Sequence, residues 1–129
     1  VQAGDDPVAW AEESTRIYAA HAFISEMMEW DPSDGRARTV ADLAKAIGSS
    51  TKTLTRVCAE RWGLKPVTVL KYVGLSQCKM AFMTPEIRKK MGFKTREQVR
   101  LFYGFKSAGN FNKSYQELFL EPPGDHWAA

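Results

Sequence analysis

The 129-residue chain is 44% apolar by composition, which suffices for one domain with a hydrophobic core but leaves no room for a separate sensor domain. No run approaches the roughly 18 to 20 consecutive apolar residues that cross a bilayer. The first residues are acidic and lack the basic region that opens a signal peptide. We therefore expect a soluble, cytoplasmic protein without a membrane partner.

Charge is unevenly distributed along the chain. Residues 1–35 carry one basic residue against eight acidic ones, whereas residues 36–120 carry 17 basic residues against five acidic ones. The whole chain still has a net charge of only +3. A middle segment this basic builds a positive surface potential that suits a polyanion.

Residues 1–35 are predicted to form an acidic helix followed by a loop. The helix runs from about Val8 to Trp30, with Pro7 near its first turn, and the run Asp31–Gly35 ends it. A stripe of apolar residues predicts packing against the next segment, and it consists of Ile17, Ala20, Phe23, Ile24, Met27 and Met28. An alternative is that the first half, up to about Ala19, protrudes as a linker or dimer contact.

Residues 36–66 have the pattern of a helix-turn-helix. Thr39 followed by Asp42 predicts a capped first helix, and Gly48 interrupts the apolar spacing at a sharp turn. Ser50 or Thr51 then caps a second helix over about residues 51–61. Its apolar side carries Leu54, Val57 and Cys58, and a small residue, Ala44, lets the two helices cross closely. On the opposite side lie Lys52, Thr55 and Arg56, whose groups suit a major groove.

Residues 67–94 are predicted to form a connecting helix and a linker. The helix begins at Pro66 and runs to about Phe82; Gly74 inside it costs roughly 1 kcal/mol relative to Ala and predicts a local weak point. Thr84-Pro85 is predicted to cap a short segment that ends near Gly92. Three bases in that segment are expected to be solvated or to face phosphates, namely Arg88, Lys89 and Lys90.

Residues 95–129 repeat the helix-turn-helix pattern and end in a tail. Thr95 with Gln98 predicts a second capping box. Aligned with the first motif, the second copy has a turn that is one residue longer and equal spacing beyond the turn, which identifies an internal repeat. The matched pairs are Gly48 with Gly104, Leu54 with Phe111, Cys58 with Tyr115, Trp62 with Phe119 and Pro66 with Pro123. The second recognition helix is predicted over about residues 108–119.

This paired arrangement resembles the DNA-binding domain of AraC/XylS-type transcriptional regulators over roughly Ala20 to Trp127. The first motif matches at Leu43, Ala44, Gly48, Ser50, Leu54, Arg56, Gly63 and Pro66. The second motif matches at Gly104, Phe105, Ser107, Phe111, Tyr115, Phe119 and Pro123.

The resemblance implies an all-α fold with two helix-turn-helix subdomains joined by a long connecting helix, preceded here by the N-terminal helix. The two recognition helices would enter successive major grooves of double-stranded DNA. Reading positions carried over from the family are Lys52, Thr55 and Arg56 in the first helix and Ala108, Gly109, Asn112 and Lys113 in the second. The full set of DNA-binding candidates is Ser50, Thr51, Lys52, Thr55, Arg56, Lys106, Ser107, Asn110, Asn112 and Lys113.

Three features depart from the family pattern. Arg100 stands where a small alanine is usual, so either the second helix pair crosses differently or Arg100 points outward. Gly74 replaces an arginine that is typical of the connecting helix. The stretch between the two motifs is about eight residues longer than usual, around Pro85 to Gly92.

We therefore expect sequence-specific DNA binding in transcriptional control. RNA polymerase is a further candidate partner, and so is a second copy, through the N-terminal helix or a domain outside this sequence. The alternative is a protein-interaction module that has kept the fold and lost base reading in its second unit. No nucleophile and base pair, metal-ligand spacing or phosphate-cradling glycine loop occurs, so we expect no catalytic site, metal or cofactor. His21 and His126 have no assigned role, and Cys58 and Cys78 are expected to be buried thiols.

Overall fold

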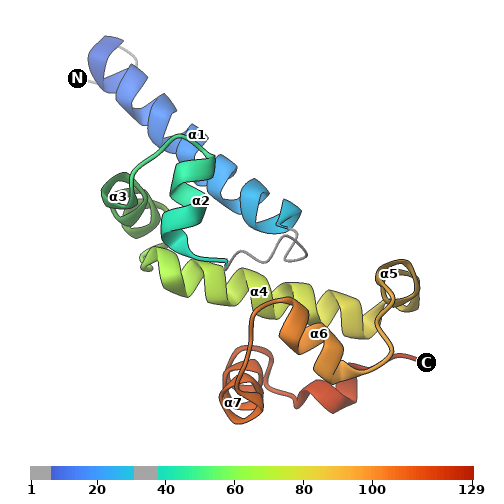
Figure 1. Ribbon diagram of the computed structural model, residues 1–129. Helices are drawn as coiled ribbons and strands as arrows, with labels where there is room; N and C mark the ends of the chain where they lie inside the picture. The colour runs from blue at the N-terminus through green and yellow to red at the C-terminus, as the bar shows by residue number, and fades with distance from the viewer. Residues whose placement is uncertain (1–6, 31–37) are drawn as a thin grey trace. The chain divides into compact units, whose positions relative to one another are not determined.

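The computed structural model describes residues 7–30 and 38–129, with side chains described from Ile17 onward (Figure 1). Within this part the chain forms α-helices, a short 3-10 helix and no strand. The predicted all-α fold with two helix-turn-helix units is confirmed. None of the helices in the described ranges is long and apolar enough to span a membrane.

The chain divides into two compact units, Val1–Leu70 and Lys71–Ala129. The first contains α1 (Pro7–Glu29), α2 (Val40–Ala46) and α3 (Thr51–Trp62). The division falls inside the connecting helix α4 (Pro66–Met83). The second contains the rest of α4 with α5 (Pro85–Met91), α6 (Arg96–Phe102), α7 (Ala108–Phe119) and the 3-10 helix η3 (Pro123–His126).

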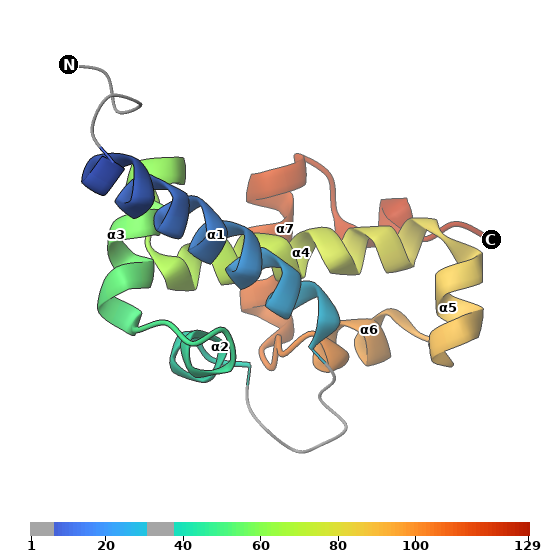
Figure 2. The same cartoon turned by 90° about the horizontal axis from the view of Figure 1, so that it is seen from above.

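In the first unit, α1 packs across α2 and α3 (Figures 1 and 2). Phe23 and Met27 of α1 are fully buried, as are Leu43 of α2 and Leu54 of α3. The predicted apolar stripe of α1 needs one correction, because Met28 is 57% exposed. Ala19 is buried instead, since the contact face runs through residues 19, 20, 23 and 27, at the i, i+3, i+4 spacing of a helix.

The turn of the first unit has the predicted chemistry. The Thr39 hydroxyl accepts a hydrogen bond from the amide of Asp42 at 3.1 Å, so Thr39 caps α2. Gly48 has a φ of +69°, a conformation that other residues rarely adopt. Ser50, rather than Thr51, caps α3, because its hydroxyl accepts from the amide of Thr53 at 3.1 Å.

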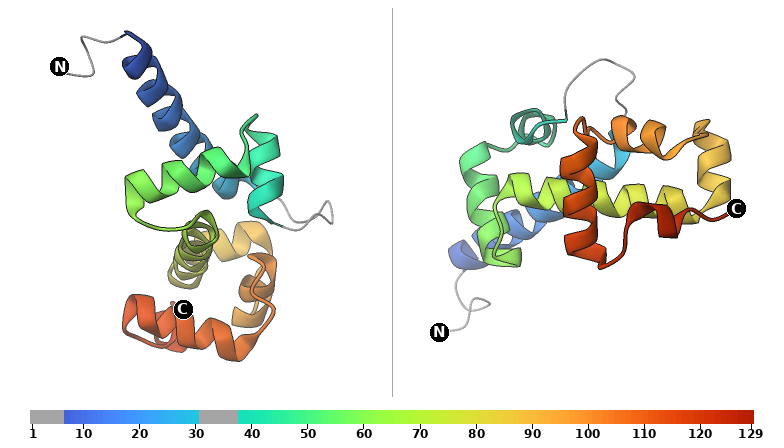
Figure 3. Two further views of the ribbon diagram at one scale, coloured as in Figure 1. Left: turned by 90° about the vertical axis from the view of Figure 1, so that its left-hand side faces the viewer. Right: turned by 90° about the horizontal axis from the view of Figure 1, so that it is seen from below.

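The second unit is built around an aromatic core, with α5, α6, α7 and η3 arranged around α4 (Figure 3). The ring of Phe82 in α4 lies 6.4 Å from that of Phe111, 5.8 Å from Tyr115 and 6.1 Å from Trp127, between ring centroids. Phe82 and Tyr115 are fully buried. Phe82 therefore joins α7 and the C-terminal tail to the connecting helix.

Gly74 is a packing position and not a break in α4, which continues to Met83. A Cβ atom on Gly74 would lie 2.9 Å from the ring of Phe105. Phe105 belongs to the segment between α6 and α7, and its ring also packs on Phe111 at 5.2 Å between centroids. The glycine therefore lets the second helix-turn-helix approach the connecting helix closely.

The prediction that Arg88 is solvated or faces phosphates is wrong, because only 8% of the residue is exposed. Its guanidinium donates to the carbonyl oxygens of Ala81, Phe82 and Ala128 and lies 4.1 Å from the centroid of the Trp127 ring. Five donors in a planar fork suit several carbonyls at once, which explains the inward orientation. Lys89 and Lys90 are exposed, as predicted.

The internal repeat is present in three dimensions. Both first helices have seven residues and both recognition helices have twelve. The Thr95 and Gln98 pair forms the predicted capping box, and Gly104 has a φ of +88° in the second turn. The copies differ at the end of the recognition helix, where Gly63 takes the left-handed conformation after α3 and Leu120 takes it after α7.

Candidate nucleic-acid interface

The outward side of α3 carries the predicted reading residues. Lys52, Thr55 and Arg56 are all exposed, while Leu54 and Val57 on the opposite side are fully buried. The core fixes this orientation, because residues 54 and 57 lie one helical turn apart and anchor the helix against α1 and α2. The arrangement presents an ammonium, a hydroxyl and a guanidinium on one surface.

The hydroxyl groups of this helix have different roles. Thr55 donates its hydroxyl proton to the carbonyl oxygen of Thr51 at 2.8 Å, so its oxygen is left to accept from a ligand. Ser50 both donates to the Thr53 hydroxyl at 3.0 Å and accepts from the Thr53 amide. Ser50 is therefore a helix cap that places the first turn, and Thr51 is exposed beside it.

The outward side of α7 is less polar at its start. Ala108, Gly109, Asn112 and Lys113 are exposed, as the resemblance implied. Ser107 caps the helix by accepting from the amide of Asn110 at 3.2 Å. The first two positions offer no side-chain group for a base edge, so the polar chemistry of α7 begins at Asn110.

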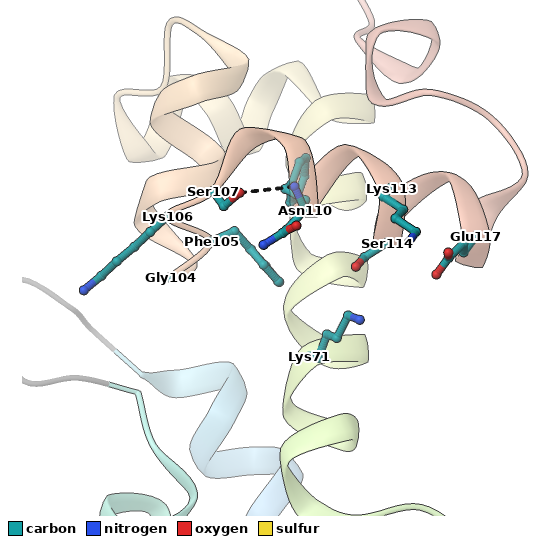
Figure 4. Close-up of a pocket in the computed structure, with 10 residues that line it drawn as sticks. Lys71, Gly104, Phe105, Lys106, Ser107, Asn110, Lys113, Ser114 and Glu117 are labelled. Atoms are coloured by element: carbon teal, nitrogen blue, oxygen red, sulfur yellow. Dashed lines mark hydrogen bonds between the residues drawn. The ribbon is translucent and has the colours of Figure 1, made fainter.

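A hollow of about 520 Å³ lies beside α7 and brings together four of the predicted residues, Lys106, Ser107, Asn110 and Lys113 (Figure 4). Figure 4 shows Lys71 reaching up from α4 beneath α7, on the same side as Ser114 and Lys113, with Lys106 at the other end. The lining thus has three ammonium groups and a single carboxylate, Glu117. Such a surface attracts an anion.

Lys71 is a lining residue that the sequence did not identify. It lies on the connecting helix, 35 residues before Lys106 and three residues before Gly74, on which Phe105 packs. The departure at Gly74 from the family pattern was the available signal. The role of Gly74 could not be inferred from the sequence, because the sequence does not show that the Phe105 ring packs against it.

Asn112 is separated from the other predicted residues of α7. With Ala108, it lines a second hollow of about 450 Å³, which also includes Thr95, Arg96 and Arg100. Asn110 and Lys113 project to one side of α7 and Asn112 to the other, in agreement with the 100° rotation per residue. The structure therefore divides the α7 candidates between two surfaces.

Arg100 does not point outward; only 8% of it is exposed. Its guanidinium donates to the carbonyl oxygens of Phe105 at 2.5 Å and Lys106 at 2.8 Å, and it lies 3.5 Å from a carboxylate oxygen of Glu97. These carbonyls belong to the turn that is one residue longer than its counterpart in the first unit. Arg100 thereby fixes the segment that leads into α7.

His126 has a structural role that sequence reasoning missed. Its Nδ1 lies 2.6 Å from the hydroxyl of Tyr115, and its Nε2 lies 2.5 Å from a carboxylate oxygen of Glu121. Burial raises the pKa of Tyr115 well above its usual value, with smaller contributions from Cys78 and Glu121. The three side chains connect η3 to the end of α7, and no motif spacing indicates such a contact.

No protein-family model matches the sequence, and no curated protein matches it either. Among solved structures, the chain is similar to a probable AraC family transcriptional regulator from Rhodopseudomonas palustris, with a TM-score of 0.64 and 21% sequence identity. The match covers 85% of this chain and 94% of that chain. This likeness confirms the fold that the paired motifs predicted.

Proposed function

We propose that the protein is a cytoplasmic transcriptional regulator of the AraC type that binds duplex DNA in a sequence-specific manner, and that it is not an enzyme. In this proposal α3 and α7 enter successive major grooves, and RNA polymerase is a further partner. The observation that carries it is the duplicated recognition helix. Two twelve-residue helices each follow a glycine turn, begin at a serine cap and present basic and polar side chains. The AraC-like fold supports the same conclusion.

The first recognition helix would supply most of the base contacts. Arg56 is exposed and has no acidic partner among the ion pairs of the described residues, so its guanidinium is available to pair with O6 and N7 of a guanine. Thr55 would accept a hydrogen bond from a base amino group, because its proton is already donated to Thr51. Lys52, in the first turn of α3, would contact a phosphate.

The second recognition helix would act mainly through the phosphate backbone. Ala108 and Gly109 occupy the start of α7 without polar side chains, while Lys71, Lys106 and Lys113 surround the adjacent hollow. Each phosphate neutralised by such a lysine releases counterions, so log K falls by about 0.9 per contact for each tenfold rise in salt. This division predicts that α3 determines sequence preference and that the hollow determines general affinity.

Selection of binding sites from random duplex DNA, followed by anisotropy titrations of variants, tests the proposal. Arg56→Ala should weaken binding to the selected site by about 1 to 3 kcal/mol and relax preference at one base pair. Lys71→Ala should weaken binding to selected and random duplexes alike and reduce the salt slope by about 0.9. Lys65→Ala, a change of an exposed lysine outside both surfaces, is the matched control.

Two outcomes would contradict the proposal. Equal effects of Arg56→Ala on selected and random duplexes would remove the base-reading role of α3. Absence of binding to any duplex at about 0.1 M salt, where charge contacts still operate over a Debye length of about 10 Å, would favour the protein-interaction module.

A further inference from the structure

The second hollow, which Arg96 and Asn112 line, contains a guanidinium without an acidic partner. Arg96 is exposed, and within residues 17–30 and 38–129, whose side chains the structure describes, it forms no hydrogen bond or ion pair. Among the residues that line this hollow, the one carboxylate is that of Glu97, which lies 3.5 Å from the guanidinium of Arg100. Two guanidinium groups against one carboxylate leave the second hollow positive, and the donors of Arg96 are available to an anion.

The C-terminal tail holds the side chain of Arg96 beside this hollow. A Cβ atom on Gly124 would lie 2.7 Å from Nη1 of Arg96 and 3.4 Å from its Cζ, so the guanidinium packs directly on the backbone of η3. Pro123, the preceding residue, lines the same hollow. Glycine provides the space for this contact, because any other side chain at position 124 would overlap the guanidinium. A side chain that is held in place before binding loses less rotational freedom when it meets a ligand.

The two hollows lie on opposite sides of α7. Ala108 and Asn112 line the second hollow and lie about 40° apart around the helix, at 100° per residue. Asn110 and Glu117 line the hollow beside α7 and lie about 180 to 200° around the helix from Ala108 (Figure 4). Phe111, which is 3% exposed, lines both hollows from the core side of the helix. The second recognition helix therefore has a cationic surface on each flank.

These positions match the two strands of a major groove. A helix with its side chains is about 10 to 12 Å across, and the major groove of B-DNA is about 12 Å wide, so a helix in the groove has the phosphates of one strand on each flank. We infer that Arg96 binds a phosphate of one strand, and that the lysines of the hollow beside α7 bind phosphates of the other strand. The inference rests on the proposed function, because it requires α7 to lie in a major groove.

The chemistry of the second hollow suits a phosphate. The planar guanidinium of Arg96 can donate to two phosphate oxygens at once, and the exposed carboxamide of Asn112 is a further donor in the same hollow. Phosphate contacts fix the position and orientation of a protein on the duplex without reading its sequence. Contacts on both flanks would therefore hold α7 across the groove, although Ala108 and Gly109 offer no group to a base edge.

Anisotropy titrations of the full chain with selected and random duplexes test the contact of Arg96. Arg96→Ala should weaken binding to both duplexes by about tenfold, the effect of one charged hydrogen bond, and reduce the salt slope by about 0.9. Arg96→Lys should keep the slope and recover only part of the affinity, because an ammonium retains the charge without the planar fork. Lys65→Ala, outside both hollows, is the matched control, and urea denaturation verifies the fold of each variant.

Neutral phosphates identify the strand. Methylphosphonate linkages, which carry no charge, are placed at one phosphate at a time in both strands of the selected duplex. A linkage at the phosphate that Arg96 contacts should weaken binding by the native protein and have no further effect on Arg96→Ala. The same comparison with Lys71→Ala locates a contact of the hollow beside α7. We expect the two sensitive phosphates to lie on different strands, across one major groove.

Three outcomes would overturn this inference alone and leave the proposed function in place. They are sensitive phosphates on the same strand, native affinity and salt slope in Arg96→Ala, and relaxed base preference in Arg96→Ala, which would assign Arg96 to a base edge. In each case Arg56→Ala and Lys71→Ala would still behave as the proposed function requires. Absence of binding to any duplex would contradict the proposed function and this inference together.

Discussion

The guanidinium of Arg100 donates to the carbonyl oxygen of Phe105 at 2.5 Å, across the turn between α6 and α7. It also donates to Lys106 at 2.8 Å. The corresponding position in the first unit is Ala44, where the turn is one residue shorter. The longer turn exposes two carbonyl groups that no helix satisfies, and the buried arginine supplies their donors. Arg100, which replaces the alanine of the first unit, therefore compensates for the extra residue in the second turn.

Arg100→Ala should destabilise the second unit by about 2 to 3 kcal/mol, because two charge-assisted hydrogen bonds are lost and their carbonyls remain partly buried. Chemical denaturation monitored by fluorescence measures this change. Arg100→Lys should recover only part of the loss, since one ammonium lacks the planar fork. A free energy of unfolding unchanged by Arg100→Ala would show that water satisfies these carbonyls equally well.

Gly74→Ala should destabilise the protein by about 1 kcal/mol, although alanine is the better helix former by a similar amount. The added Cβ would lie 2.9 Å from the ring of Phe105, which is held against Phe111. In a Phe105→Ala background the same change should become stabilising. Gly109→Ala is the matched control, because nothing lies within 4 Å of its added Cβ, and it should stabilise by up to about 1 kcal/mol. Stabilisation by Gly74→Ala in the native background would show that the Phe105 ring moves at little cost.

Leu120→Gly should stabilise the protein by about 1 kcal/mol. Leu120 has a φ of +63° and is 86% exposed, so glycine removes backbone strain without losing buried area. Thermal denaturation measures the effect. Leu120→Ala should leave stability nearly unchanged, because alanine meets the same restriction on φ. If both substitutions change stability equally, the side chain of Leu120 and not its backbone conformation is responsible.

Stability should fall as the pH rises from about 9 to 11, in part through Cys58. Burial raises the pKa of its thiol from 9.0 to about 11 in the folded protein. The folded state keeps this proton while the unfolded state releases it, so the stabilisation is complete below pH 9 and is lost as the pH approaches 11. Urea denaturation at several pH values measures the slope. Cys58→Ala should show a shallower slope over this range, and identical slopes would exclude a contribution from the thiol.

Local sequence patterns predicted the helices and most of their caps. Thr84 is the exception, because it precedes α5 but makes no side-chain capping hydrogen bond. Thr39, Ser50 and Thr95 cap helices as predicted. Each cap is a hydrogen bond between a side-chain oxygen and a backbone amide three residues later, so it can be predicted from a short stretch of sequence. The apolar spacing of Leu54 and Val57 placed Lys52, Thr55 and Arg56 on the outward side of α3. The duplicated spacing, which indicated the fold, is also a property of the linear chain.

Long-range packing decided the roles of the residues that departed from the pattern. Whether Arg88 and Arg100 faced solvent depended on carbonyl groups placed near them by other segments, including Ala128, 40 residues from Arg88. Lys71 lines the hollow with residues of α7 that lie more than 30 positions later in the sequence, and the packing of Phe105 on Gly74 lies three residues away on the same helix. The sequence by itself determined the helices, most of their caps and the outward side of each recognition helix, since these follow from periodicity and local hydrogen bonds. Only the tertiary structure decided which charged side chains became anchors and which remained available to a partner, because that depends on groups distant in sequence.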